Sequence, residues 1–126
     1  MSQAIASLMK RQVWTIGMDD TVAQVESLFV REGLSWAPVL ESGRTMVGVI
    51  SATDLLQFHA RQQDPNAARA WQLCTYRPIT VAPDTPIGHV ARLMVDQLIH
   101  HVVVVDGTGI VGVVSSLDFV RTFVCE

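Results

Sequence analysis

Several kinds of residue are scarce in this chain of 126 residues, and each scarcity excludes a class of protein. Charged residues make up 17% of the sequence against 49% for hydrophobic ones, so extended disorder is not expected. The net charge of -3 provides no basic field for nucleic acid. The longest apolar run, residues 102–105, is far too short to span a bilayer, and the first ten residues lack the layout of a signal peptide. We therefore expect a folded cytoplasmic protein that binds neither nucleic acid nor membrane.

Cysteine is also scarce. The two cysteines, Cys74 and Cys125, stand too far apart for a metal-ligand motif. We expect free thiols in a reducing compartment. The alternative is a redox role or an intermolecular disulfide, formed through Cys125 near the end of the chain.

An internal repeat is the most informative feature of the sequence. Leucine occupies positions 8 and 73, threonine 15 and 80, and valine 39 and 104, each pair 65 positions apart. Gly48 and Gly112, like Asp54 and Asp118, are 64 positions apart. The second copy therefore lacks one residue between Val104 and Gly112. We place the deletion in the turn between the two buried strands, where it disturbs the fold least. A register kept over this length indicates a duplicated unit.

Each copy predicts the same order of elements. A short extended segment (13–16 or 78–81) precedes a helix that begins near residues 19–21 or 84–86, where capping side chains stand and Pro86 suits the first helical position. Two buried strands follow, at 36–40 and 46–50 and at 101–105 and 110–114, and a final helix ends each copy. Gly33 ends the first long helix, whereas Leu98 stands at the matching place and the second helix needs another stop. Pro38 lacks a backbone N–H, so we expect its strand to lie at a sheet edge or to begin there.

Each copy is thus a β-α-β-β-α unit with too few residues to close its own core. This predicts an α/β fold in which two repeats pack sheet to sheet with pseudo-two-fold symmetry. We expect a first repeat at residues 1–61, a linker at 62–69 and a second repeat at 70–126, forming one compact module.

The pattern Gly-x-x-Ser-x-x-Asp occurs twice, at residues 48–54 and 112–118, together with Pro38-Val39 and the segment 80–85, Thr-Val-Ala-Pro-Asp-Thr. In this order and spacing it resembles the cystathionine-β-synthase (CBS) domain pair, or Bateman module, standing alone. The resemblance implies clefts between the repeats that bind adenosine-containing ligands, mostly AMP, ADP or ATP and less often S-adenosylmethionine or NAD. It further implies regulation of a partner protein and assembly into a homodimer.

Two serine–aspartate pairs, Ser51 with Asp54 and Ser115 with Asp118, stand where a strand enters a helix. Helix capping alone would explain each pair. The same geometry also suits a nucleotide, because a helix start attracts phosphate and an aspartate accepts hydrogen bonds from ribose hydroxyls. The resemblance implies these ligand-binding roles for both pairs.

Two adjacent histidines, His100 and His101, precede the second buried strand. A metal half-site is one interpretation, but no Asp, Glu or Cys stands at a helpful spacing, so no metal is expected. A solvent-exposed or hydrogen-bonded pair is another. The resemblance implies that His101, and next to it His100, contacts phosphate. Trp36 stands at the place of His101 in the first copy, where it would stack on a base or fill the cleft.

The resemblance also assigns the remaining pocket residues. Two threonines would line the adenosine pocket, Thr15 and Thr80. Its apolar wall would be formed by Ala37, Pro38, Val102 and Val103.

Three classes of function follow. The first is a regulatory module that binds an adenine nucleotide, needs no catalytic cofactor and signals to an unidentified effector protein. The second is a dimerisation scaffold with empty clefts, in which Phe123 and Val124 join the interface. An enzyme is not expected, because the sequence shows no nucleophile–base set and no glycine-rich phosphate loop.

Overall fold

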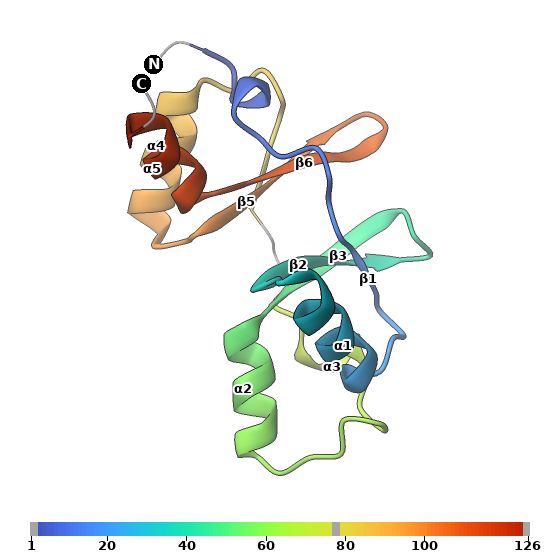
Figure 1. Cartoon of the computed structure of the whole chain (residues 1–126). Coiled ribbons are helices and arrows are strands. Elements are labelled where there is room, and N and C mark those ends of the chain that lie inside the picture. The colour runs from blue at the N-terminus through green and yellow to red at the C-terminus, as the bar shows by residue number, and fades with distance from the viewer. Residues whose placement is uncertain (1–2, 77–78, 125–126) are drawn as a thin grey trace. The chain divides into compact units, whose positions relative to one another are not determined.

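The computed structural model describes residues 3–76 and 79–124, and these form two compact units. One unit comprises the described residues of 14–78, and the other those of 1–13 and 79–126 (Figure 1).

The unit of residues 14–78 contains a three-stranded sheet with helices packed against it. Its elements are β1 (Ile16–Gly17), α1 (Val22–Glu32), β2 (Trp36–Glu41), β3 (Thr45–Ser51), α2 (Ala52–Ala60) and the short α3 (Ala70–Leu73). The strand order is β1-β2-β3, with β1 parallel and β3 antiparallel to the central β2. Thr21 caps α1 with a capping box, because its side chain accepts from the Gln24 N–H while the Gln24 side chain accepts from the Thr21 N–H. The buried core includes Val25, Phe29, Val39, Ile50 and Phe58.

The second unit repeats this plan. It contains the 3-10 turn η1 (Ile5–Ser7), β4 (Thr80–Val81), α4 (Ile87–Gln97), β5 (His101–Asp106), β6 (Gly109–Ser115) and α5 (Ser116–Val124). The strand order β4-β5-β6 has the same parallel and antiparallel pairings. Residues of both helices and of β5 and β6 share one core: Ile87, Val90, Met94, Val102, Val104, Val114 and Phe119. The predicted α/β fold of two β-α-β-β-α repeats is confirmed.

The missing residue of the second copy falls in the hairpin turn, as predicted. Glu41 pairs with Thr45 across the first turn, whereas Asp106 pairs with Gly109 across the second, which is one residue shorter. Both hairpins carry the same irregularity, a register shift between Val39 and Leu40 in one and between Val104 and Val105 in the other. The deletion therefore leaves the strands unchanged.

The segment that leads into each repeat packs on the unit formed by the other repeat. Ile5 donates its N–H to the Thr85 carbonyl at 2.7 Å, and Lys10 forms an isolated bridge with Val113. In the same way, Trp71 donates to the Met18 carbonyl at 3.0 Å. The boundaries of the compact units therefore differ from those of the sequence repeats, because the two lead-in segments are exchanged.

Two glycines allow these exchanged segments to approach. A Cβ on Gly48 would lie 2.6 Å from the Thr75 carbonyl oxygen, and one on Gly112 would lie 2.5 Å from Met9 Sδ and 3.0 Å from the Lys10 carbonyl oxygen. A side chain at either position would thus push the crossing backbone away. This close approach explains the glycine that opens each Gly-x-x-Ser-x-x-Asp pattern.

The expectation for Pro38 was wrong. Pro38 lies within β2, the central strand, and pairs with Val49. The Val49 N–H and carbonyl bond Thr75, at 3.1 and 2.8 Å, so they do not need Pro38. At the matching place of the second unit, Val103 donates to the Ile79 carbonyl at 3.3 Å. Because Pro38 has no N–H, the first sheet lacks the hydrogen bond that Val103 donates in the second. Proline is tolerated there because β1 begins only at Ile16.

Helix α4 also differs from expectation at both ends. Pro86 is the N-cap rather than the first helical residue. No separate stop is needed at the other end, because Leu98 itself adopts the left-handed conformation, with φ of 54°, and caps the helix. Gly33 ends α1 in the same conformation, at φ of 66°. Leu98 thus takes a backbone geometry that favours glycine.

Cys74 is a buried free cysteine. Burial raises the pKa of its thiol, which disfavours the reactive thiolate. Cys125, and with it the predicted alternative of an intermolecular disulfide, lies outside the described residues. Within the described chain, no helix is long and apolar enough to cross a membrane.

Candidate functional site

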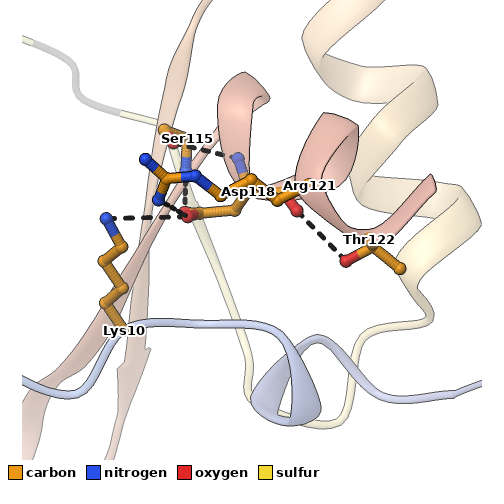
Figure 2. Close-up of polar contacts among 5 residues, drawn as sticks. All are labelled: Lys10, Ser115, Asp118, Arg121 and Thr122. Carbon is orange, nitrogen blue, oxygen red and sulfur yellow. Dashed lines mark hydrogen bonds and ion pairs between the residues drawn. The ribbon is translucent and has the colours of Figure 1, made fainter. Parts of the chain in front are cut away.

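The most enclosed charged group of the described residues is Asp118, in the first turn of α5. Its side chain is 8% exposed. The Ser115 N–H donates to Asp118 Oδ2 at 2.8 Å, and the Asp118 N–H donates to Ser115 Oγ at 3.3 Å (Figure 2). The predicted capping geometry is therefore present at this helix start, and it fixes the direction of the carboxylate.

Two cations approach the other oxygen of this carboxylate. Lys10 Nζ lies 3.7 Å and Arg121 Nη1 4.0 Å from Asp118 Oδ1 (Figure 2). Sequence reasoning missed both residues. Arg121 follows Asp118 by three residues, a spacing that brings helical side chains together. The signal for Lys10 was Gly112, since a glycine inside a strand marks the close approach of another backbone.

The histidine pair is tied to the same helix start. His101 pairs with Ser115 across β5 and β6, and the Ser116 N–H donates to the His100 carbonyl at 2.9 Å. His100 is exposed, while His101 is half-buried. Burial lowers the pKa of His101, the positive charge of His100 lowers it further, and Asp118 opposes both. His101 is therefore mostly neutral at pH 7.

Two further predicted residues lie on the adjoining strands of this unit. Thr80 of β4 pairs with Val103 of β5, two residues along β5 from His101. Thr80 is exposed and Val103 is fully buried. The structure thus gathers Ser115, Asp118 and the histidines at one end of β5 and β6.

The first unit repeats the arrangement around Asp54. The Ser51 N–H and the Ser51 hydroxyl both donate to Asp54 Oδ2, at 2.8 and 3.0 Å, and the Asp54 N–H donates to Ser51 Oγ at 3.2 Å. Asp54 also faces a cavity of about 540 Å³. The Asp54 carboxylate therefore accepts from the backbone N–H of its serine, as the Asp118 carboxylate does. Its other partner is the Ser51 hydroxyl, whereas the other partners of Asp118 are cations.

The strand residues of the first site keep the predicted neighbours. Trp36 pairs with Ser51 across β2 and β3, just as His101 pairs with Ser115. Ala37 and Pro38, the predicted apolar wall, are buried. Thr15 is exposed, as Thr80 is, but it precedes β1 and therefore does not join the sheet as Thr80 does.

Both sites present groups that can bind a ligand. Each offers a helix start, a serine and an oriented carboxylate, groups that can hold an anion and a pair of hydroxyls. Among the residues that the structure describes, no group of three or more His, Cys, Asp or Glu side chains is placed to hold a metal ion. Among these described residues, His100 and His101 therefore have no third side chain with which to complete a metal site.

The chain belongs to the CBS domain family, whose model matches residues 5–61 and 70–124. It is thus a pair of CBS domains. Over 125 residues it is 28% identical to the uncharacterized protein MJ0188 of Methanocaldococcus jannaschii, covering 97% of this chain but 44% of that protein. A matching segment also occurs within an enzyme, the homoserine O-acetyltransferase of Methanococcus vannielii, at 26% identity over 119 residues, 94% of this chain and 24% of the enzyme. The chain therefore spans less than half of the length of these relatives.

Solved CBS pairs share the fold. The CBS domain pair of protein MJ0100, in complex with 5′-methylthioadenosine and S-adenosyl-L-methionine, superposes with a TM-score of 0.87 at 23% identity, covering 99% of this chain and 98% of the other. CBSX2 in complex with AMP superposes with a TM-score of 0.82 at 22% identity, covering 98% and 97%. At these identities the likeness establishes the fold.

Proposed function

We propose that this CBS pair is a regulatory module that binds an adenine nucleotide of the AMP, ADP or ATP class and signals to a partner protein. The observation that supports this proposal most strongly is the duplicated serine–aspartate geometry. In each copy the serine N–H donates to one oxygen of the aspartate carboxylate at 2.8 Å, Ser51 to Asp54 and Ser115 to Asp118. Such a carboxylate is pre-oriented to accept from ribose hydroxyls beside a helix start that attracts phosphate. Adenosine compounds bound by CBSX2 and by the MJ0100 pair support the same ligand class.

The proposal assigns roles to the residues of each site. Asp118 and Asp54 would accept from ribose, and Ser115 and Ser51 would donate to phosphate together with the adjoining helix N–H groups. His101, with His100 beside it, would contact phosphate when charged. Pocket walls would be supplied by the strand residues: Thr15, Trp36, Ala37, Pro38, Thr80 and Val103. Binding would favour one arrangement of the module over another, and a partner would respond to that shift.

Isothermal titration calorimetry tests the proposal directly. AMP, ATP and S-adenosylmethionine are titrated into the wild-type chain and into Asp118→Ala, with folding of the variant checked by circular dichroism. We expect saturable binding of AMP or ATP by the wild type and at least tenfold weaker binding at one site in the variant, since hydrogen bonds to a charged group contribute about 1.5–3 kcal/mol. Absence of binding by the wild type at millimolar concentration would refute nucleotide sensing. Preference for S-adenosylmethionine would make the module a sensor of that compound.

A dimerisation scaffold is the second candidate, favoured by exposed apolar side chains on α4, at its C-cap and on α5. Val95 is 71%, Leu98 86% and Phe123 61% exposed. Exposed apolar surface of this kind is typical of protein interfaces. A homodimer can also bind nucleotide, so the two functions need separate measurements. Calorimetry tests nucleotide binding, and sedimentation velocity with and without AMP tests dimerisation. A monomer at every concentration would refute the scaffold.

A further inference from the structure

Two cations of different origin converge on one enclosed carboxylate. Lys10 comes from the lead-in segment and Arg121 from the second turn of α5, yet both contact Asp118 Oδ1 (Figure 2). Their side chains are 58% and 59% exposed, whereas that of Asp118 is 8% exposed. The carboxylate is thus fixed, and the cations reach it from solvent with room to move.

The backbone, rather than the side-chain contact, holds Lys10 at this place. The Lys10 N–H donates to the Val113 carbonyl at 2.9 Å, and the Val113 N–H donates to the Lys10 carbonyl at 3.0 Å. Gly112 lets this pair of bonds form, because any side chain there would meet Met9 and the Lys10 carbonyl. The ammonium group can therefore leave Asp118 without any loss of the fold around it.

The Asp54 site lacks counterparts of both cations. The offset of the duplication places Thr75 opposite Lys10, and both make the same bridge, Thr75 with Val49 and Lys10 with Val113. Gln57 stands at the place of Arg121. The cavity at Asp54 is lined by a second carboxylate, Asp64, and by one cation, Arg61, as its charged groups. The two sites therefore differ in charge although their backbones correspond.

This difference has a consequence for ligands. A ribose that bonds to Asp118 competes with Lys10 and Arg121 for Oδ1, since Ser115 already occupies Oδ2. Both cations are more than half exposed and lie 3.7 and 4.0 Å from Oδ1, so solvent screens their hold on it and the competition is weak. An uncharged nucleoside displaces the cations without offering them a new partner. A nucleotide provides one, because its phosphate takes charge-assisted hydrogen bonds from lysine and arginine.

On the basis of the proposed function, we infer that Lys10 and Arg121 make the Asp118 site selective for ligands with a 5′-phosphate, by exchanging their contact with Asp118 for one with the phosphate. Lys10 and Arg121 are the cations paired with Asp118 Oδ1, the oxygen that a ribose would approach. The Asp54 site, without them, binds nucleoside and nucleotide with more nearly equal affinity.

Calorimetric titrations of adenosine and AMP into the wild type, Lys10→Met and Lys10→Arg test the inference. We expect Lys10→Met to weaken AMP binding by roughly threefold to tenfold, in line with an exposed charge-assisted contact. The same variant should bind adenosine as tightly as the wild type or a few-fold more tightly, because one competitor for Asp118 is gone. Lys10→Arg should restore most of the AMP affinity. A role in folding alone would weaken both ligands together.

Arg11→Met is the matched control, since it removes a neighbouring exposed positive charge from the same segment without altering the Asp118 contacts. It should leave the ratio of AMP to adenosine affinity near the wild-type value. If AMP and adenosine bind the wild type equally, or if Lys10→Met changes both alike, phosphate selection is overturned while nucleoside binding stands. If neither compound binds the wild type, the proposed function and the inference both fail.

Discussion

At the scale of single residues, the two sites are set apart by what surrounds an otherwise identical serine–aspartate pair. Asp54 Oδ2 accepts from the Ser51 hydroxyl as well as from the Ser51 N–H, whereas Asp118 faces two cations. Asp118, Ser115 and His101 could be predicted from the sequence because their spacing recurs within a short segment. Lys10 could not, since Gly112 indicates only that some backbone comes close, and more than a hundred residues separate Lys10 from Val113, with which it pairs.

His101 predicts a pH dependence of nucleotide binding. Burial lowers its pKa in the unliganded protein, and His100 lowers it further, against Asp118. A bound phosphate favours the charged imidazole and so raises that pKa. The complex then binds more protons than the free protein, and affinity rises as pH falls through the pKa of the complex. Since the ordinary value is about 6.5, we expect AMP to bind the wild type more tightly at pH 6 than at pH 8.

His101→Gln is the control for this prediction. AMP itself takes up a proton near a pH of about 6, which weakens its attraction to Lys10 and Arg121. This effect is common to both proteins, so calorimetry on wild type and variant isolates the histidine. Identical pH profiles would show that His101 does not contact the phosphate.

At the scale of elements, the order of strands and helices could be read from the duplicated pattern, but the crossing segments could not. Hydrophobic spacing specifies α1, β2 and β3 locally, whereas the pairing of Ile5 with Thr85 is a long-range contact with no local signal. The sheet position of Pro38 was misjudged for a related reason. Its tolerance depends on where β1 begins, and neighbouring strands are set by tertiary structure.

The glycines beneath the crossing segments make a test at this scale. Gly48→Ala should lower the free energy of unfolding by about 1–3 kcal/mol, because the added Cβ overlaps a backbone carbonyl that cannot turn aside. Gly112→Ala should cost less, since Met9, a flexible side chain, is the nearest group. Gly107→Ala, with nothing within 4 Å, serves as the control and should change stability by less than about 0.5 kcal/mol. Urea denaturation measures all three. Equal values for Gly48→Ala and Gly107→Ala would contradict the close approach.

The end of α4 offers a second test. Leu98 holds a left-handed conformation at φ of 54° with its side chain 86% exposed. Leu98→Gly should therefore raise the free energy of unfolding by about 1 kcal/mol, because the strain of a Cβ at this geometry is removed. Gly33→Leu, the reverse change at the corresponding end of α1, should lower it by a similar amount. A loss of stability in Leu98→Gly would show that the leucine side chain makes contacts worth more than the strain.

At the scale of the whole molecule, the chain is a CBS pair whose two repeats have diverged in charge. A duplicated fold supplies two equivalent helix starts, and Lys10 and Arg121 beside Asp118, against Thr75 and Gln57 at the corresponding positions of the Asp54 site, make them chemically unequal. Under the proposed function, two unequal sites would let one module respond to both a nucleotide and a nucleoside. The proposed partner would then respond to the occupied state that each ligand favours.

Nuclear magnetic resonance of the ¹⁵N-labelled chain, titrated with AMP, tests nucleotide binding most directly because it reports each helix start separately. We predict saturable shifts of the backbone amides of Ser115, Ser116 and Asp118, and their loss in Asp118→Ala at the same AMP concentrations. Unchanged amides at both Ser115–Asp118 and Ser51–Asp54 in the presence of millimolar AMP would contradict the assignment of this CBS pair as a nucleotide-binding module.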